Sequence, residues 1–311
     1  MSATTSPRVA RAAIAQLRST RDKQSNLMNV AKCAGWAQRD GAQMMFLPEC
    51  LGFMGDSAEH TLNQADPPII ELKQHCETPP PQTPFRRALA DTIASYARME
   101  GNDADDVDEP YGGKADGESF TSIIEELRFI ACEAKLWISG GGVHTTVPPS
   151  DIVASTPPSE RKIYNTHVII DSDGQIKAYY HKVHLFDVSI PGINLRESNT
   201  TAPGKRLVVC DSPIGKLGLS ICYDMRFSEM YVDLVQKGGA EVLLMPSAFT
   251  VPTGKAHWHT LLRGKVENSV HKFLCKKHQF NFLSINSIFY PGSSCDRESV
   301  LRPSRCPGWS T

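Results

Sequence analysis

Three residues that together could attack a carbonyl group each follow the end of a short apolar segment: Glu49, Lys182 and Cys222. A thiol needs a base to become an efficient nucleophile, and a carboxylate such as Glu49 can accept its proton. A fixed positive charge on Lys182 would lower the pKa of Cys222 and stabilise an oxyanion. The three residues therefore predict acyl transfer at a carbonyl carbon.

The segment Lys216–Phe227 gives Cys222 a favourable local setting. Lys216–Ile221 is apolar and short, which is typical of a buried strand, and Tyr223–Phe227 leads toward a helix. Backbone N–H groups at such a junction favour negative charge on sulfur. The alternative is a buried structural cysteine, which is the commoner role of a single cysteine.

A second carboxylate, Glu197, lies in the downstream segment N-L-R-E-S-N and could position Lys182 or a hydrolytic water. Each residue also has an ordinary explanation. Glu49 could cap a helix or form an ion pair, Lys182 lies between two histidines as a surface lysine often does, and Glu197 could be only a loop acid.

The histidines are a weak indication of a metal site. His181 and His184 have no acidic or cysteine partner at a useful spacing. His271, Cys275 and His278 lie at helical spacing and could bind zinc by chance. We therefore predict no metal site.

The elements that would carry these residues alternate between strand and helix. The patterns predict a helix at Gln24–Arg39, a strand at Met44–Leu47, a strongly amphipathic helix at Phe120–Ala134 and a strand at Leu136–Gly140. Two further hairpins are expected to deliver Lys182 and Cys222. Strand–helix–strand order predicts an α/β layered fold, in which reacting groups gather at the carboxyl ends of strands.

The composition excludes several classes of protein. The chain has 311 residues, of which 41% are hydrophobic and 22% charged, enough for a sizeable core. The net charge of -1 gives no reason to expect nucleic acid or an anionic membrane as a partner. The nine cysteines contain no C-x-x-C pair, and no secretory signal precedes them, so we expect a reducing, cytoplasmic compartment. The Ser/Thr- and Arg-bearing amino terminus is also compatible with mitochondrial import.

Two regions depart from this pattern. Residues 66–109 are Pro-rich and then acidic, and we interpret them as a mostly solvated surface insertion. After Arg263 the chain loses its periodic pattern. We therefore divide it into a domain at 1–263 and a divergent tail at 264–311, in which we expect no strand of the main fold. Missing strands would expose sheet edges, so we expect a poorly stable or aggregation-prone chain; a cooperative thermal transition above physiological temperature would contradict this expectation.

Three segments together resemble the signature blocks of the nitrilase superfamily of carbon–nitrogen hydrolases. They are F-L-P-E at Phe46–Glu49, H-K-V-H-L-F-D-V at His181–Val188 and G-L-S-I-C-Y-D-M-R-F at Gly218–Phe227. The resemblance implies a four-layer αββα sandwich, with C-terminal strands replaced in this chain. It also implies homo-oligomers, a small-molecule amide substrate and no cofactor.

The resemblance further implies a role for each site residue. Glu49, Lys182 and Cys222 match the catalytic triad, and Glu197 matches a supporting glutamate. The backbone N–H of Tyr223 would hold the oxyanion with Lys182. Arg226 is a candidate to bind a substrate carboxylate, or alternatively forms a structural salt bridge.

Within the superfamily, four segments resemble the deaminated glutathione amidase branch: Y-N-T-H at 164–167, E-S-N-T at 197–200, P-S-A-F at 246–249 and T-G-K-A-H-W at 253–258. This implies hydrolysis of deaminated glutathione to 2-oxoglutarate and cysteinylglycine. The sister ω-amidase branch, acting on 2-oxoglutaramate, is the alternative. A third hypothesis is a catalytically impaired form that serves only as a binding or assembly partner.

Overall fold

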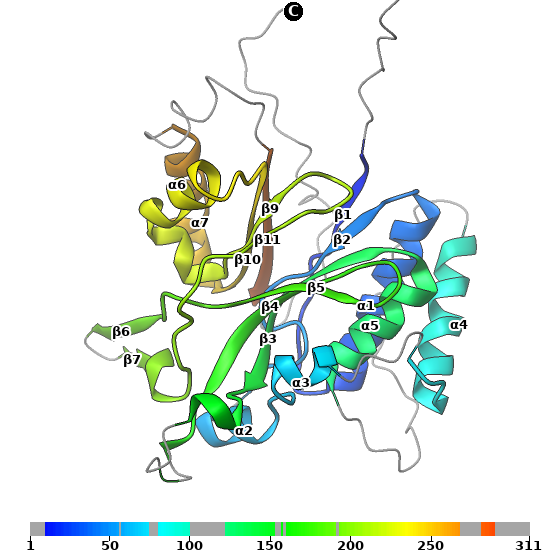
Figure 1. Ribbon diagram of the computed structural model, residues 1–311, viewed down its shortest axis with the longest axis horizontal. Coiled ribbons are helices and arrows are strands. Elements are labelled where there is room, and N and C mark those ends of the chain that lie inside the picture. The colour runs from blue at the N-terminus through cyan, green and yellow to red at the C-terminus, as the bar shows by residue number, and fades with distance from the viewer. Residues whose placement is uncertain are drawn as a thin grey trace, which may run out of the picture.

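The computed structural model of the protein describes residues 10–55, 57–74, 80–99, 122–152, 157, 160–190, 193–267 and 281–289. Two main sheets form the centre of this part of the chain (Figure 1). The first sheet has the strand order β1 (Ala12–Ile14), β2 (Met44–Phe46), β3 (Trp137–Thr146), β4 (Ile163–Ile170) and β5 (Ile176–His181). The second has the order β11 (Asn281–Phe289), β10 (Val242–Thr250), β9 (Leu217–Gly218) and β8 (Val209–Cys210).

Each of the two main sheets combines parallel and antiparallel strand pairs. β1, β2 and β3 run parallel, whereas β4 and β5 add antiparallel strands. In the second sheet, β10 pairs in parallel with both β9 and β11. A separate hairpin, β6 (Asp187–Ile190) and β7 (Ile193–Arg196), extends away from both sheets in Figure 1.

Helices cover the outer faces of both sheets. α1 (Lys23–Arg39), α4 (Pro84–Arg98) and α5 (Ile123–Ala134) lie on the first sheet, and α6 (Ser228–Gln236) and α7 (Val251–Glu267) lie on the second (Figure 1). Two short helices, α2 (Ala58–Asn63) and α3 (Ile69–Gln74), lie between α1 and α4 in the chain. The order helix, sheet, sheet, helix confirms the α/β sandwich predicted from the sequence.

Side chains along β2 alternate between the two faces of the first sheet and so pack against both neighbouring layers. Met45 packs in the core between the first sheet and its helices, together with Leu47 just beyond the strand. Met44 and Phe46 belong to the second core cluster, with apolar residues of the other sheet. All four side chains are fully buried, so one short segment contributes to both cores.

Several element ends differ from the sequence prediction. β3 does not end at Gly140 but continues to Thr146, with a register shift between Gly140 and Val143. The glycine run, which suggested a strand end, is instead a bulge next to the other sheet. α5 begins at Ile123, three residues after the predicted start at Phe120.

Helix α4 corrects the interpretation of residues 66–109 as a solvated surface insertion. Phe85, Leu89 and Ile93 are buried at the four-residue spacing of one helix face, and α4 packs against α1 and α5. The acidic run Asn102–Glu109 lies outside the described residues.

Asp66 also belongs to the core rather than to a surface loop. Its carboxylate accepts hydrogen bonds from the backbone N–H groups of Ile123 and Ile124 and from the Ser122 hydroxyl, and so caps the amino terminus of α5. Burial raises the pKa of Asp66, while these three donors oppose the shift. A cap supplied from a distant segment leaves no local sequence signal.

The strand β11 corrects the expectation that no strand of the main fold follows Arg263. Asn281–Phe289 pairs with β10 over nine residues, from Val242 opposite Asn281 to Thr250 opposite Phe289. The segment N-F-L-S-I-N-S-I-F is rich in aromatic and β-branched residues, which favour a strand. Because β11 pairs with this edge of β10, one reason for the expected instability is removed.

Candidate active site

Glu49 lies just beyond β2, where the first sheet approaches β10. Its side chain is 5% exposed. Oε1 accepts hydrogen bonds from Lys182 Nζ at 3.1 Å and from Asn165 Nδ2 at 2.9 Å. Oε2 accepts one from the backbone N–H of Ala248 at 2.9 Å. The carboxylate is therefore held by donors from three separate elements.

Lys182 follows directly after β5, and its buried ammonium lies between two carboxylates. Nζ is 3.1 Å from Glu49 Oε1 and 3.0 Å from Glu197 Oε2. Burial alone would lower the pKa of Lys182, but the negative charges of Glu49 and Glu197 outweigh it and raise that pKa well above its usual value. The lysine therefore carries a fixed positive charge, as the sequence suggested.

Cys222 begins a short 3₁₀ turn, Cys222–Arg226, that follows Ser220 and Ile221. Its backbone has φ of 45°, a conformation that only a tightly defined turn imposes on a residue other than glycine. The residue is half-buried, and its sulfur lies 3.9 Å from the carbonyl oxygen of Ala248. Ala248 thus contacts both Cys222 and Glu49.

Lys182 lowers the pKa of Cys222, as predicted, but the net pKa of the thiol is raised. Burial raises the pKa of the thiol, and the charge of Glu49 and its hydrogen bond to the thiol raise it further. Lys182 acts in the opposite direction but is outweighed. At neutral pH the sulfur is therefore protonated, with a carboxylate beside it that can accept the proton.

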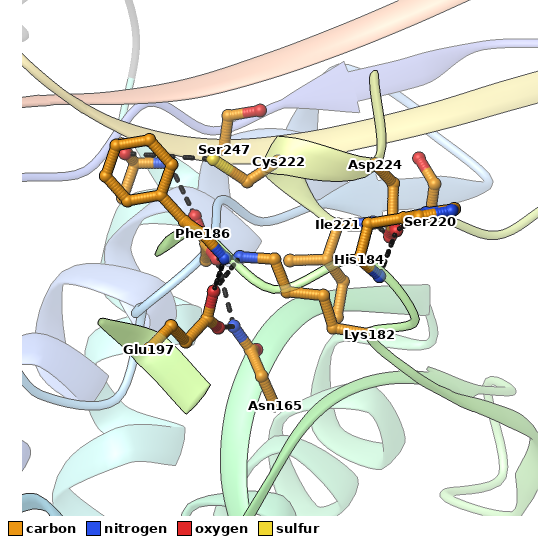
Figure 2. A network of polar contacts seen from close by, with 12 residues as sticks. Asn165, Lys182, His184, Phe186, Glu197, Ser220, Ile221, Cys222, Asp224 and Ser247 are labelled. Atoms are coloured by element: carbon orange, nitrogen blue, oxygen red, sulfur yellow. Dashed lines mark hydrogen bonds and ion pairs between the residues drawn. The ribbon is translucent and has the colours of Figure 1, made fainter. Parts of the chain in front are cut away.

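The structure brings Glu197 to Lys182, as expected. The glutamate follows β7, and Oε2 also accepts a hydrogen bond from the backbone N–H of Phe186 at 2.7 Å. Figure 2 shows Lys182, Glu197 and Asn165 converging from different elements.

Asn165 was missed by the sequence reasoning. It lies on β4, is 3% exposed, and its Nδ2 is 2.9 Å from Glu49 Oε1 and 3.4 Å from Glu197 Oε1. The available signal was a group of polar residues, Asn165–His167, inside a predicted strand, because a buried amide must find partners.

A second buried carboxylate, Asp224, ties the Cys222 turn to the Lys182 segment. Oδ2 accepts hydrogen bonds from the Tyr180 hydroxyl at 2.8 Å and the Ile221 backbone N–H at 2.9 Å. Oδ1 accepts from the backbone N–H and Nδ1 of His184, at 3.0 and 2.8 Å. Asp224 therefore fixes Cys222 relative to Lys182 without touching either side chain.

Aromatic side chains surround the Cys222 turn. The rings of Phe186 and Tyr223 lie edge to face at 5.2 Å, and His184 stacks on Phe227 at 3.6 Å. Arg226 is exposed, with its guanidinium 5.5 Å from the Tyr223 ring centre. Among the described residues Arg226 forms no salt bridge, so the structural ion pair considered for it is not present there.

The described residues hold no group of three or more metal-ligating side chains. His181 and His184 point to different partners: His181 Nδ1 pairs with the Thr166 hydroxyl, and His184 Nδ1 with Asp224. His271, Cys275 and His278 lie outside the described residues. Within the same part of the chain, no helix combines the length and apolar character needed to span a bilayer.

The sequence of residues 11–270 matches the profile of a family described as carbon-nitrogen hydrolase. The chain belongs to the carbon-nitrogen hydrolase family. This confirms the resemblance to the nitrilase superfamily. The three resembling blocks thus meet in one place, at the ends of β2 and β5 and in the segment after β9.

Individual relatives agree with this family. The chain is 47% identical over 154 residues to deaminated glutathione amidase of Dictyostelium discoideum, covering 48% of this chain and 49% of the relative. It is 42% identical over 154 residues to an omega-amidase of Saccharomyces cerevisiae, covering 49% of each. The crystal structure of the Caenorhabditis elegans NitFhit protein superposes with a TM-score of 0.59 at 30% identity, over 90% of this chain and 52% of that chain. The chain therefore spans about half the length of these relatives.

Proposed function

We propose that the protein is a cysteine-dependent amidase that hydrolyses the C–N bond of a small linear amide. The observation that supports this most directly is the contact of one carboxylate, Glu49, with both an ammonium and a protonated thiol. That arrangement supplies a base, a positive charge and a nucleophile within one buried cluster.

The first half of the reaction forms a thioester. Glu49 takes the proton of Cys222 as the sulfur attacks the amide carbonyl. Lys182 and the backbone N–H of Tyr223 stabilise the oxyanion; Tyr223 is the second residue of the 3₁₀ turn, so its N–H lacks a partner within that turn. Glu49 then gives its proton to the leaving amine, which departs as the C–N bond breaks.

The second half regenerates the thiol. Glu49 takes a proton from water, whose oxygen attacks the thioester, and returns it to the sulfur as the acid leaves. Glu197 holds Lys182 in place for both halves, because its Oε2 lies 3.0 Å from the ammonium.

For the substrate we propose deaminated glutathione, which would yield 2-oxoglutarate and cysteinylglycine. The sequence segments shared with that branch and the 47% identity to the Dictyostelium amidase support this choice. Arg226 is the proposed partner of a substrate carboxylate, since it is exposed beside the Cys222 turn. The 42% identity to an omega-amidase supports 2-oxoglutaramate as the second candidate.

Hydrolysis of the two amides distinguishes the candidates. Purified protein and Cys222→Ala are incubated separately with deaminated glutathione and 2-oxoglutaramate, and released 2-oxoglutarate is measured. Turnover by the parent chain but not by the variant supports the amidase, and the preferred amide identifies the substrate. A folded parent chain that hydrolyses neither amide would leave the binding-partner hypothesis in place of the enzyme.

We also propose a cytoplasmic homo-oligomer, with mitochondrial import as an additional possibility. Light scattering after size-exclusion chromatography tests the oligomer: a monomer at micromolar concentration would contradict it. Cell fractionation tests the location.

A further inference from the structure

The side-chain amide of Asn165 joins the two carboxylates that face Lys182. Its Nδ2 lies within hydrogen-bonding distance of Glu49 Oε1 and, at the longer distance of 3.4 Å, of Glu197 Oε1. Lys182 bridges the same two groups from the other side, through Glu49 Oε1 and Glu197 Oε2. We infer that Asn165 is a positioning residue that keeps Glu49 charged and oriented as the base for Cys222.

The local charge balance explains why such a residue is needed. Two carboxylates share one ammonium, so this buried cluster has an excess negative charge. Like charges in one buried site favour protonation of one carboxylate, and a protonated Glu49 could not accept a proton from Cys222. The two N–H bonds of a neutral amide can each favour the ionised form of one carboxylate without adding a positive charge that would compete with Lys182.

The surroundings fix the orientation of the Asn165 amide. Its nearest polar neighbours are carboxylate oxygens, which can only accept, so the NH₂ group must face them. The backbone carbonyl of Asn165 accepts from the Lys182 N–H at 2.9 Å, so one residue positions both Lys182 and Glu49.

A neighbouring glycine makes room for this contact. A Cβ atom on Gly142 would lie 2.9 Å from Glu49 Cγ and 3.0 Å from Asn165 Oδ1. Any larger residue there would push the amide and the carboxylate apart. The bulge in β3 therefore serves the same contact that Asn165 makes from β4.

The other titratable groups near Glu49 do not compete for its proton near neutral pH. Burial raises the pKa of Cys50 well above its usual value and lowers the pKa of His144 to about 4, so both side chains are neutral. Lys182 remains charged. The pH dependence of Cys222 reactivity should therefore report on Cys222 and its contact with Glu49.

The inference rests on the proposed function, so its test measures the reactivity of the Cys222 thiol and does not depend on amide hydrolysis. Iodoacetamide is added to the parent chain, Asn165→Asp and Asn165→Leu between pH 5.5 and 9, and the alkylation rate of the Cys222 peptide is followed by mass spectrometry. Asn165→Asp replaces a donor by a third carboxylate. For Asn165→Asp we expect the alkylation rate at pH 7 to fall about tenfold and the pH profile of alkylation to move to higher pH by about one unit. For Asn165→Leu we expect the pH profile to move in the same direction and the rate at pH 7 to fall about threefold.

Asn26→Asp is the matched control. Asn26 is also buried, and its amide donates to the carbonyls of Thr20 and Gly52 rather than to catalytic carboxylates. Its profile should match that of the parent once rates are scaled to the folded fraction. Superimposable profiles for the parent and both Asn165 variants, or an equal shift in Asn26→Asp, would overturn the inference. If Asn165→Asp does not fold, the pH profile of Asn165→Leu alone tests the inference.

The outcome is separable from that of the proposed function. Shifted profiles in a protein that hydrolyses neither amide would support Asn165 and reject the amidase. Hydrolysis with unshifted profiles would support the amidase and reject the role of Asn165.

Discussion

Two buried carboxylates lie close in the chain's interior but differ in what surrounds them. Asp224 accepts four hydrogen bonds, all from groups that are fixed in the fold: the Tyr180 hydroxyl, the Ile221 N–H and two donors of His184. A carboxylate has about four acceptor sites, so Asp224 has no capacity left for a reacting group.

Glu49 accepts three such bonds, from Lys182, Asn165 and Ala248. It also contacts the thiol of Cys222, a weak donor whose proton can be transferred. The two carboxylates therefore differ in whether a transferable proton lies among their contacts. Four donors fixed in the fold make Asp224 a structural clamp, whereas the contact with the thiol lets Glu49 act as a base.

Glu49→Gln should separate chemistry from stability most clearly. The amide keeps the shape of the side chain but cannot accept the Cys222 proton, so we expect amide hydrolysis to fall about 10³-fold. Glu197 still neutralises Lys182, so the variant should remain folded. Initial rates and thermal melting of the same preparation check both statements. Hydrolysis within tenfold of the parent rate would contradict the role of Glu49 as the base.

Asp224→Asn should affect stability as well as rate. The substituted NH₂ group must face two of the four donors, which leaves buried donors without acceptors. We expect unfolding to require about 3 kcal/mol less free energy. The Cys222 turn would also loosen relative to Lys182, so hydrolysis per folded molecule should fall about tenfold. Urea denaturation gives the first value and initial rates the second; an unchanged denaturation midpoint would mean that Asp224 is not a clamp.

The sequence predicted the reacting groups better than the groups that hold them. Glu49, Lys182 and Cys222 each follow a strand, and strand ends can be recognised from apolar runs. The supporting side chains form hydrogen bonds with partners that are distant in the sequence, as Asp66 does with Ile123. Asn165 and Asp224 are the other examples. No local pattern encodes such partners, because they depend on how the layers pack.

Distant contacts also limited the prediction of pKa values and of secondary-structure elements. The sequence placed Lys182 near Cys222 and so predicted a lowered thiol pKa, but burial and Glu49 reverse the direction. Strand β11 was missed because flanking irregular segments obscured a short apolar pattern. Tertiary packing, rather than local propensity, decides this segment.

Mild acid should weaken the contact between the sheets through His167. This buried histidine on β4 pairs with the Ser139 hydroxyl and with the Ser220 carbonyl, two residues before Cys222. Burial lowers its pKa to about 4, so the unfolded chain binds more protons between about pH 6.5 and 4. Stability is therefore lost as pH falls through this window, by about 2 kcal/mol from His167 alone at pH 5.

Denaturation of the parent chain and His167→Gln at pH 7 and pH 5 checks this contribution. The variant should lose less stability than the parent between the two pH values. His144 and His181, whose pKa values burial also lowers to about 4, contribute equally to both proteins and cancel in the difference. Equal losses in parent and variant would mean that His167 is not a source of the acid sensitivity.

Tyr180→Phe should give the smallest effect and a fine test of the clamp. The hydroxyl donates to Asp224 and accepts from the Val183 N–H, so its removal leaves one unpaired donor and one weakened acceptor. We expect a loss of about 1–2 kcal/mol in unfolding free energy. Tyr179→Phe is the control, because the neighbouring hydroxyl makes no hydrogen bond with the described residues and contacts His181 only through its ring. Hydrolysis per folded molecule should fall only a few-fold in Tyr180→Phe, since Asp224 retains its bonds to His184 and Ile221. A loss of activity as large as that of Glu49→Gln would contradict the assignment of a catalytic role to Glu49 and a structural role to Asp224.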